Sequence, residues 1–77
     1  MLYKIVVDSQ IRLFDCKEAL TLEALKAFVE KTFPKLGPCS FYYIDEDEDQ
    51  IMLESKEDVD VFLDYGQKKP KIYVRQT

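Results

Sequence analysis

The sequence predicts a small α+β domain in which a mixed five-stranded sheet packs against two helices. Three observations support this class. The chain has 77 residues, enough for one compact core. Five short runs are rich in β-branched and aromatic residues, as strands are. Two longer segments place apolar residues at helical spacing behind a capping residue. We therefore expect residues 1–77 to form a single domain.

The first two strands are predicted at residues 2–7 and 11–14, joined by the polar turn Asp8-Ser9-Gln10. If Val7 pairs with Ile11, Ile5 lies opposite Leu13 and Lys4 opposite Phe14. Strand alternation then assigns two faces. The predicted core face carries Tyr3, Ile5, Val7, Ile11 and Leu13. The predicted outer face carries Lys4, Val6, Arg12 and Phe14, with Lys4 and Arg12 as diagonal neighbours.

The main helix is predicted from Thr21, a favourable N-cap, to Phe33, because Pro34 ends it. Its buried stripe is predicted to be Leu22, Leu25, Phe28 and Val29. Gly37 and Pro38 then mark a loop.

The second half of the chain predicts strands at residues 41–44, 51–53 and 72–74 and a second helix between the last two. Ser55 caps this helix, and Asp58 completes a variant of the capping box. The helix ends at Tyr65, and Gly66 suits its C-terminal exit. Its apolar face is Val59, Phe62 and Leu63.

The resulting order is β-β-α-β-β-α-β. A mixed sheet curled around one main helix, the ubiquitin-like β-grasp roll, fits this order in fewer than 80 residues. A ferredoxin-like sandwich would need the helices at other places in the sequence.

The composition excludes several classes of function. No apolar run approaches the roughly 20 residues of a membrane span, and the charged Lys4, Asp8 and Arg12 interrupt any signal-peptide core. We expect a cytoplasmic protein without a membrane partner. The chain has no His and only two Cys, Cys16 and Cys39, which we expect to be buried thiols, with a single disulfide or redox pair as the alternative. Without a nucleophile beside an evident base, we expect no enzyme activity, no cofactor and no small-molecule substrate.

The charges are separated along the chain. Residues 45–64 contain ten acids and one base, whereas the other residues contain ten bases and five acids. The domain is therefore expected to have one strongly acidic pole. Nucleic acid is an unsuitable partner because it needs a basic surface, while a basic protein surface complements the pole.

Five consecutive carboxylates, Asp45 to Asp49, connect two predicted strands. Loop acids are commonly just solvated, but five in a row repel one another, and a docked cation relieves that repulsion. Extended backbone would direct Asp45, Asp47 and Asp49 to one side. An EF-hand calcium loop does not fit, because Gln50 and Lys56 stand where Gly and Glu are required. We expect no specific metal site.

With these residues in view, the chain resembles the Phox-and-Bem-one (PB-one) domain over essentially its whole length. That family carries an acidic OPCA motif, which appears here as Tyr43-Ile44-Asp45-Glu46-Asp47-Glu48-Asp49 followed by Ser55-Lys56-Glu57-Asp58-Val59. Glu48 replaces the usual Gly and is expected to alter the turn and re-aim Asp49. Lys4 matches the family's first-strand lysine, and Arg12 matches a supporting basic position.

The resemblance implies a non-enzymatic interaction and scaffolding module that binds other PB-one domains front to back, with itself or with a different partner. The implied acidic face is Asp45, Glu46, Asp47, Asp49, Glu57 and Asp58. The implied basic face is Lys4 and Arg12. An alternative is a ubiquitin-like domain that binds a small GTPase through a basic sheet edge, although this leaves the acidic run unexplained.

Overall fold

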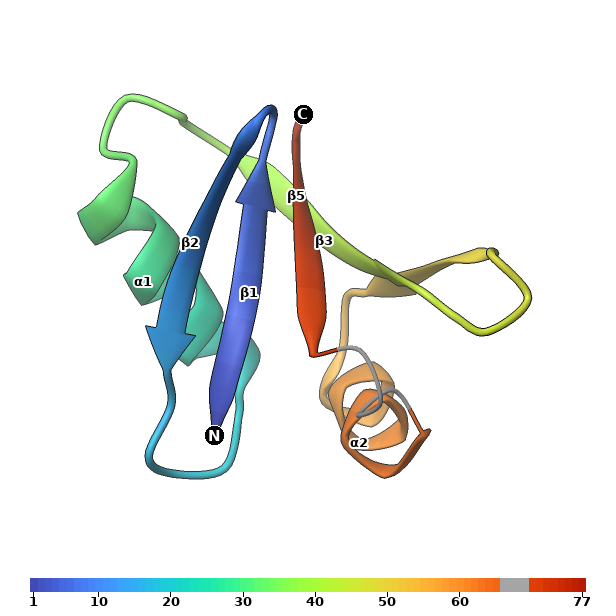
Figure 1. Ribbon diagram of the computed structural model, residues 1–77. Coiled ribbons are helices and arrows are strands. Elements are labelled where there is room, and N and C mark those ends of the chain that lie inside the picture. Colours follow the sequence, from blue (N-terminus) through green and yellow to red (C-terminus); the bar gives the residue numbers. More distant parts are fainter. Residues whose placement is uncertain (66–69) are drawn as a thin grey trace.

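The computed structural model describes residues 1–65 and 70–77, and its elements follow the predicted order (Figure 1). Five strands and two helices occur along the chain: β1 (Leu2–Val7), β2 (Gln10–Asp15), α1 (Leu22–Thr32), β3 (Cys39–Ile44), β4 (Gln50–Leu53), α2 (Lys56–Tyr65) and β5 (Lys71–Gln76). The strands form one sheet in the order β2-β1-β5-β3-β4. β1 and β5 are parallel, and the other neighbours are antiparallel. The predicted mixed sheet of a β-grasp fold is confirmed.

The predicted pairing of β1 with β2 was wrong by one residue. The strands are joined by the two-residue turn Asp8-Ser9, so Val7 pairs with Gln10 and Lys4 with Leu13. Asp8 adopts a positive φ of 53°, which Asp tolerates better than most residues and which closes the shorter turn. Because side chains alternate along a strand, this shift moves every β2 side chain to the opposite face.

Ile11 and Leu13 are therefore not in the core, as the sequence had suggested, but 55% and 62% exposed. Phe14, which was predicted on the outer face, lies on the core side of the sheet. It pairs with Tyr3 and stacks on Phe28 of α1 with ring centroids 4.6 Å apart.

Both helices begin at the predicted caps. The Thr21 hydroxyl accepts a hydrogen bond from the Ala24 amide at 3.1 Å, and α1 ends at Thr32 with Phe33 as its C-cap, directly before Pro34. In α2, the Asp58 amide donates to Ser55 Oγ at 3.2 Å, and Asp58 Oδ2 accepts from the Ser55 amide at 3.1 Å. This reciprocal pair is the predicted capping box. Gly66, the predicted helix exit, lies outside the described residues.

The core lies between the sheet and the two helices. Its buried members are Tyr3, Ile5, Val7, Cys16, Leu20, Leu25, Val29, Phe41, Tyr43, Leu53, Val59, Phe62 and Ile72. Phe62 of α2 contacts both Tyr3 and Tyr43, which shows that α2 covers the same face of the sheet as α1. The opposite face, here called the outer face, carries Leu2, Lys4, Val6, Ile11, Leu13, Tyr42, Lys71 and Tyr73. No helix among the described residues has the length and apolar character needed to cross a membrane.

Candidate functional site

The acidic loop, residues 45–49, closes the β3–β4 hairpin and is stabilised by one of its own carboxylates. Asp45 Oδ1 accepts hydrogen bonds from the amides of Asp47 at 2.9 Å and Asp49 at 2.8 Å. The backbone adds two bonds, from the Asp45 amide to the Asp49 carbonyl and from the Glu48 amide to the Asp45 carbonyl, each at 3.0 Å. A turn of this kind relies on Asp because its side chain reaches the amides that follow.

Three carboxylates converge at this loop, as the alternation of the sequence suggested. One oxygen each of Asp45, Asp47 and Asp49 lies within 4.8 Å of the others. Asp45 is half-buried, whereas Asp47 and Asp49 are exposed. The convergence comes from the Asp45-centred turn and not from extended backbone. Carboxylates so placed attract a lysine ammonium group or a divalent cation.

Glu48 adopts a positive φ of 64°. Gly adopts this left-handed region readily, whereas any residue with a Cβ atom has a higher conformational energy there. The backbone thus keeps the conformation that a Gly would adopt at this position, so the expectation that Glu48 alters the turn was wrong.

The first turn of α2 carries the other predicted acidic residues, Glu57 and Asp58. Burial raises the pKa of the Tyr43 hydroxyl, and the nearby carboxylates of Asp45 and Asp58 raise it further. Both acidic segments therefore act on the same tyrosine, and the acidic loop together with Glu57 and Asp58 is called the acidic surface below. Asp58 itself has a pKa below its usual value, chiefly because it accepts a hydrogen bond from the Glu54 amide at 2.9 Å. Glu57 is exposed on the same turn, and Glu46 is exposed on the loop.

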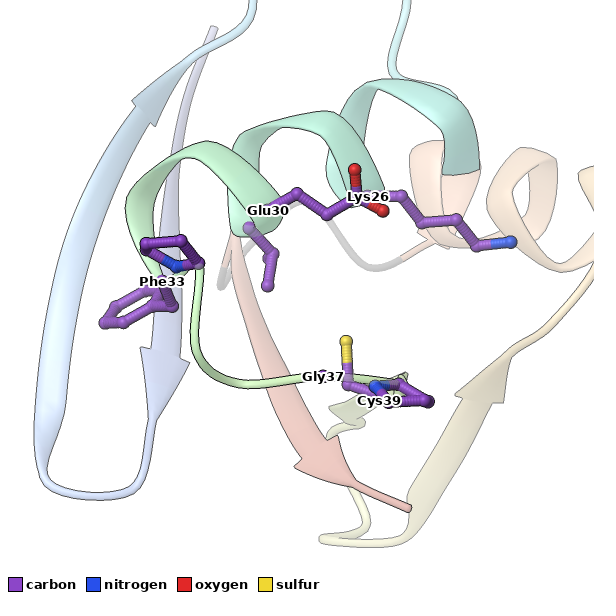
Figure 2. Close-up of a pocket in the computed structure, with 8 residues that line it drawn as sticks. Lys26, Glu30, Phe33, Gly37 and Cys39 are labelled. Atoms are coloured by element: carbon purple, nitrogen blue, oxygen red, sulfur yellow. The ribbon is translucent and has the colours of Figure 1, made fainter.

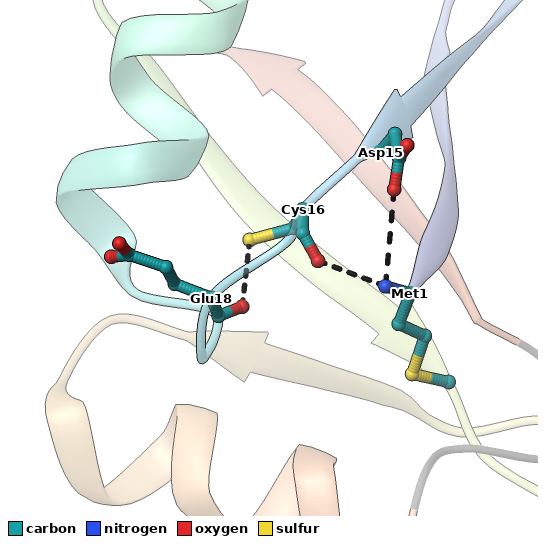
Figure 3. A network of polar contacts seen from close by, with 4 residues as sticks. All are labelled: Met1, Asp15, Cys16 and Glu18. Atoms are coloured by element: carbon teal, nitrogen blue, oxygen red, sulfur yellow. Dashed lines mark hydrogen bonds and ion pairs between the residues drawn. The ribbon is translucent and has the colours of Figure 1, made fainter.

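Lys4 lies on the outer face of β1 and is exposed. Within residues 1–65 and 70–77, its ammonium group has no carboxylate within 4.0 Å. The nearest acid by register is Asp15, one diagonal step away on β2. Asp15 instead lies 3.9 Å from the Met1 amino group, which also donates to the Cys16 carbonyl at 2.9 Å (Figure 3). The first-strand lysine is therefore neither buried nor neutralised by its own acidic loop.

Arg12 was predicted on the face that carries Lys4, and this placement was wrong. The corrected register pairs Arg12 with Ile5, so its side chain lies on the helix side of the edge strand. Its guanidinium carbon is 5.6 Å from the ring centroid of Phe33, a cation–π contact at the end of α1. Lys4 and Arg12 consequently do not form a pair on one surface.

A different cation stands beside Lys4. Lys71 of β5 is the register partner of Lys4 in the parallel pair, and it points to the same outer face. Sequence reasoning missed Lys71 because it did not pair the last strand with the first. The alternation around the buried Ile72, together with the central place of β1 and β5 in a β-grasp sheet, would have indicated it.

The structure also has an open depression of about 410 Å³ between the end of α1 and the start of β3 (Figure 2). The Cys39 thiol points into it, toward Lys26 and Glu30. Burial raises the pKa of this thiol, Glu30 raises it further and Lys26 opposes the shift. A protonated thiol is a poor nucleophile, so the depression offers no evident chemistry. Of the two free cysteines, Cys16 is buried as expected and Cys39 is half-buried.

The β-grasp fold carries an acidic hairpin loop on one side and, on its open sheet face, the exposed Lys4 and the half-buried Lys71, an arrangement typical of a protein-interaction module. The comparison with known families agrees: the PB1 domain matches residues 3–77. The chain therefore belongs to the PB1 domain family, the family that its acidic motif and first-strand lysine resemble. Members of this family are protein–protein interaction modules that bind other PB1 domains. No curated protein matches the chain.

Proposed function

We propose that this domain binds other PB1 domains front to back. The acidic loop and the first turn of α2 would receive a lysine from one partner, and Lys4 would enter the acidic surface of another. The observation that supports the proposal most directly is that the charged groups of both surfaces are open to a partner. Lys4 is exposed and has no ion-pair partner within the described part of the chain, while three carboxylates converge at the acidic loop.

Such a contact joins two different surfaces of the domain. A heterologous contact between identical copies propagates into open chains unless the rotation closes a ring. Opposite charges speed association and select the partner, and salt weakens them because the Debye length falls from about 10 Å at 0.1 M to about 3 Å at 1 M.

Sedimentation velocity of three proteins tests the proposal: wild type, Lys4→Ala, and Asp47→Asn combined with Asp49→Asn. Asp45 is left intact because it supports the loop. We expect wild type to associate with increasing concentration at 0.1 M salt and to dissociate at 1 M salt. Each variant alone should be a monomer.

A mixture of the two variants should form a 1:1 complex, because one retains the acidic surface and the other retains Lys4. The proposal of self-association is refuted if the variants associate alone as strongly as wild type, or if the mixture stays monomeric.

A further inference from the structure

Two lysines occupy the same level of neighbouring strands on the outer face. Lys4 and Lys71 are register partners in β1 and β5. Their outward direction is fixed because the next residues, Ile5 and Ile72, are fully buried on the other side. Neighbouring strands lie about 4.8 Å apart, so the two side chains leave the sheet close together. Like charges directly opposite one another in a sheet are destabilising unless an anion lies between them.

The described part of the chain supplies no such anion. Neither lysine has a carboxylate within 4.0 Å among these residues. The Lys71 ammonium group instead lies 5.9 Å from the ring centroid of Tyr73, a cation–π contact that holds the side chain over the outer face. Tyr73 in turn stacks on Tyr42 with centroids 5.1 Å apart. Lys71 is therefore a positioned cation that has no counter-ion among the described residues.

Apolar side chains border the two lysines. Leu13 is the register partner of Lys4 on β2 and is 62% exposed, and Leu2 is 53% exposed on the same face. A partner that covers these side chains excludes water from the lysines, which strengthens their attraction to carboxylates.

We propose that Lys4 and Lys71 act together as a two-cation site that binds two carboxylates of the acidic loop in a second copy of this chain. This inference rests on the proposed front-to-back contact and adds Lys71 to it. The charges and the spacing are complementary, because the loop carboxylates lie within 4.8 Å of one another, close to the separation of adjacent strands. β3 separates β5, which carries Lys71, from β4, which follows the acidic loop (Figure 1). One molecule can therefore present the lysines and the acidic loop at the same time.

The test isolates a single contact between two variants. The first variant carries Lys4→Ala and Lys71→Ala and keeps the acidic loop. It is called the donor because it contributes the acidic loop to the contact. The second, called the acceptor, carries Asp47→Asn and Asp49→Asn and keeps the lysines. Calorimetric titration of the acceptor with the donor gives the Kd of one interface. The acceptor is then changed further by Lys4→Gln, Lys71→Gln or Arg75→Gln.

We expect Lys71→Gln and Lys4→Gln each to raise the Kd by about 10-fold or more. Arg75→Gln is the matched control, because it removes one positive charge from the same strand. Arg75 already contacts Gln50 and the Tyr42 ring, and we expect a change below about 2-fold. Thermal unfolding of each acceptor verifies that it is folded.

Three outcomes oppose the inference in different ways. If the acceptor and donor do not associate, the front-to-back self-contact itself is wrong. If Lys4→Gln weakens binding and Lys71→Gln does not, the proposed function stands and the two-cation site is refuted. If Arg75→Gln weakens binding as much as Lys71→Gln, net charge and not a specific pair is responsible.

Discussion

Asp45 has a structural role in the acidic loop besides its charge. Its Oδ1 atom holds two backbone amides of the loop, so its removal leaves these amides without their partner. Asp47 and Asp49 contribute exposed carboxylates to the same cluster. Within one short motif, the residue that shapes the loop is thus distinct from those best placed to meet a partner.

Replacing Asp45 by Ala should lower the free energy of unfolding by about 1 kcal/mol, the usual cost of losing a capping acceptor. Asp45→Asn should cost less because it keeps an acceptor oxygen at the same position. Chemical denaturation at pH 7 measures both. Asp47→Ala is the control, since it removes a charge from the same loop. Equal stability of Asp45→Ala and Asp47→Ala would show that the two hydrogen bonds contribute nothing.

Glu48 adds a conformational cost to this loop. A left-handed backbone costs a non-glycine residue roughly 1–2 kcal/mol, while Gly loses roughly 0.5–1 kcal/mol in chain entropy. Glu48→Gly should therefore be more stable than Glu48→Ala by about 0.5–1 kcal/mol, because both remove the charge and only Gly removes the strain. Denaturation of the two variants under identical conditions compares them directly. A more stable Ala variant would mean that the φ of 64° is not strained.

At the scale of secondary structure, the β1–β2 turn decides what the outer face contains. A two-residue turn places Leu13 outside and Phe14 inside, whereas the longer turn expected from the sequence would reverse them. The pattern IRLF has apolar residues on both faces of the strand, so periodicity alone could not select the register.

Substitutions in β2 discriminate between the two registers. Leu13→Thr should change the free energy of unfolding by no more than about 0.5 kcal/mol, as exposed substitutions do. Phe14→Ala should cost about 2–4 kcal/mol because it removes the ring that stacks on Phe28. Thermal or chemical unfolding measures both variants. The reverse order of stabilities would restore the longer turn and return Arg12 to the face of Lys4.

Local signals predicted most of the elements. Thr21 and Ser55 mark helix starts, Pro34 marks a helix end, and each predicted strand lies within an observed one. The convergence of Asp45, Asp47 and Asp49 was also predictable because the three residues are close in sequence. The basic side was not, because Lys4 and Lys71 meet only through a parallel pairing of the first and last strands. That contact depends on the whole topology and not on local pattern.

At the scale of the whole molecule, the β-grasp topology separates the two charged surfaces. The acidic loop extends from the β3–β4 edge of the sheet, and Lys4 lies near the opposite edge, next to β2 (Figure 1). This separation leaves both surfaces open in one copy, which is the condition for chain growth in the proposed function.

Chain growth by a heterologous contact has a property that a symmetric dimer lacks: a copy with one blocked surface ends the chain. Adding the Lys4→Ala variant to wild type at equal concentration should therefore lower the average mass of the assemblies, because each variant molecule binds through its acidic surface and offers no lysine to the next copy. The average mass from sedimentation velocity at 0.1 M salt reports this. The matched control is a variant that combines Lys4→Ala with Asp47→Asn and Asp49→Asn, which should join no chain and leave the mass of the wild-type assemblies unchanged. If Lys4→Ala and this control have the same effect, the contact between copies does not run from the acidic loop to the first-strand lysine.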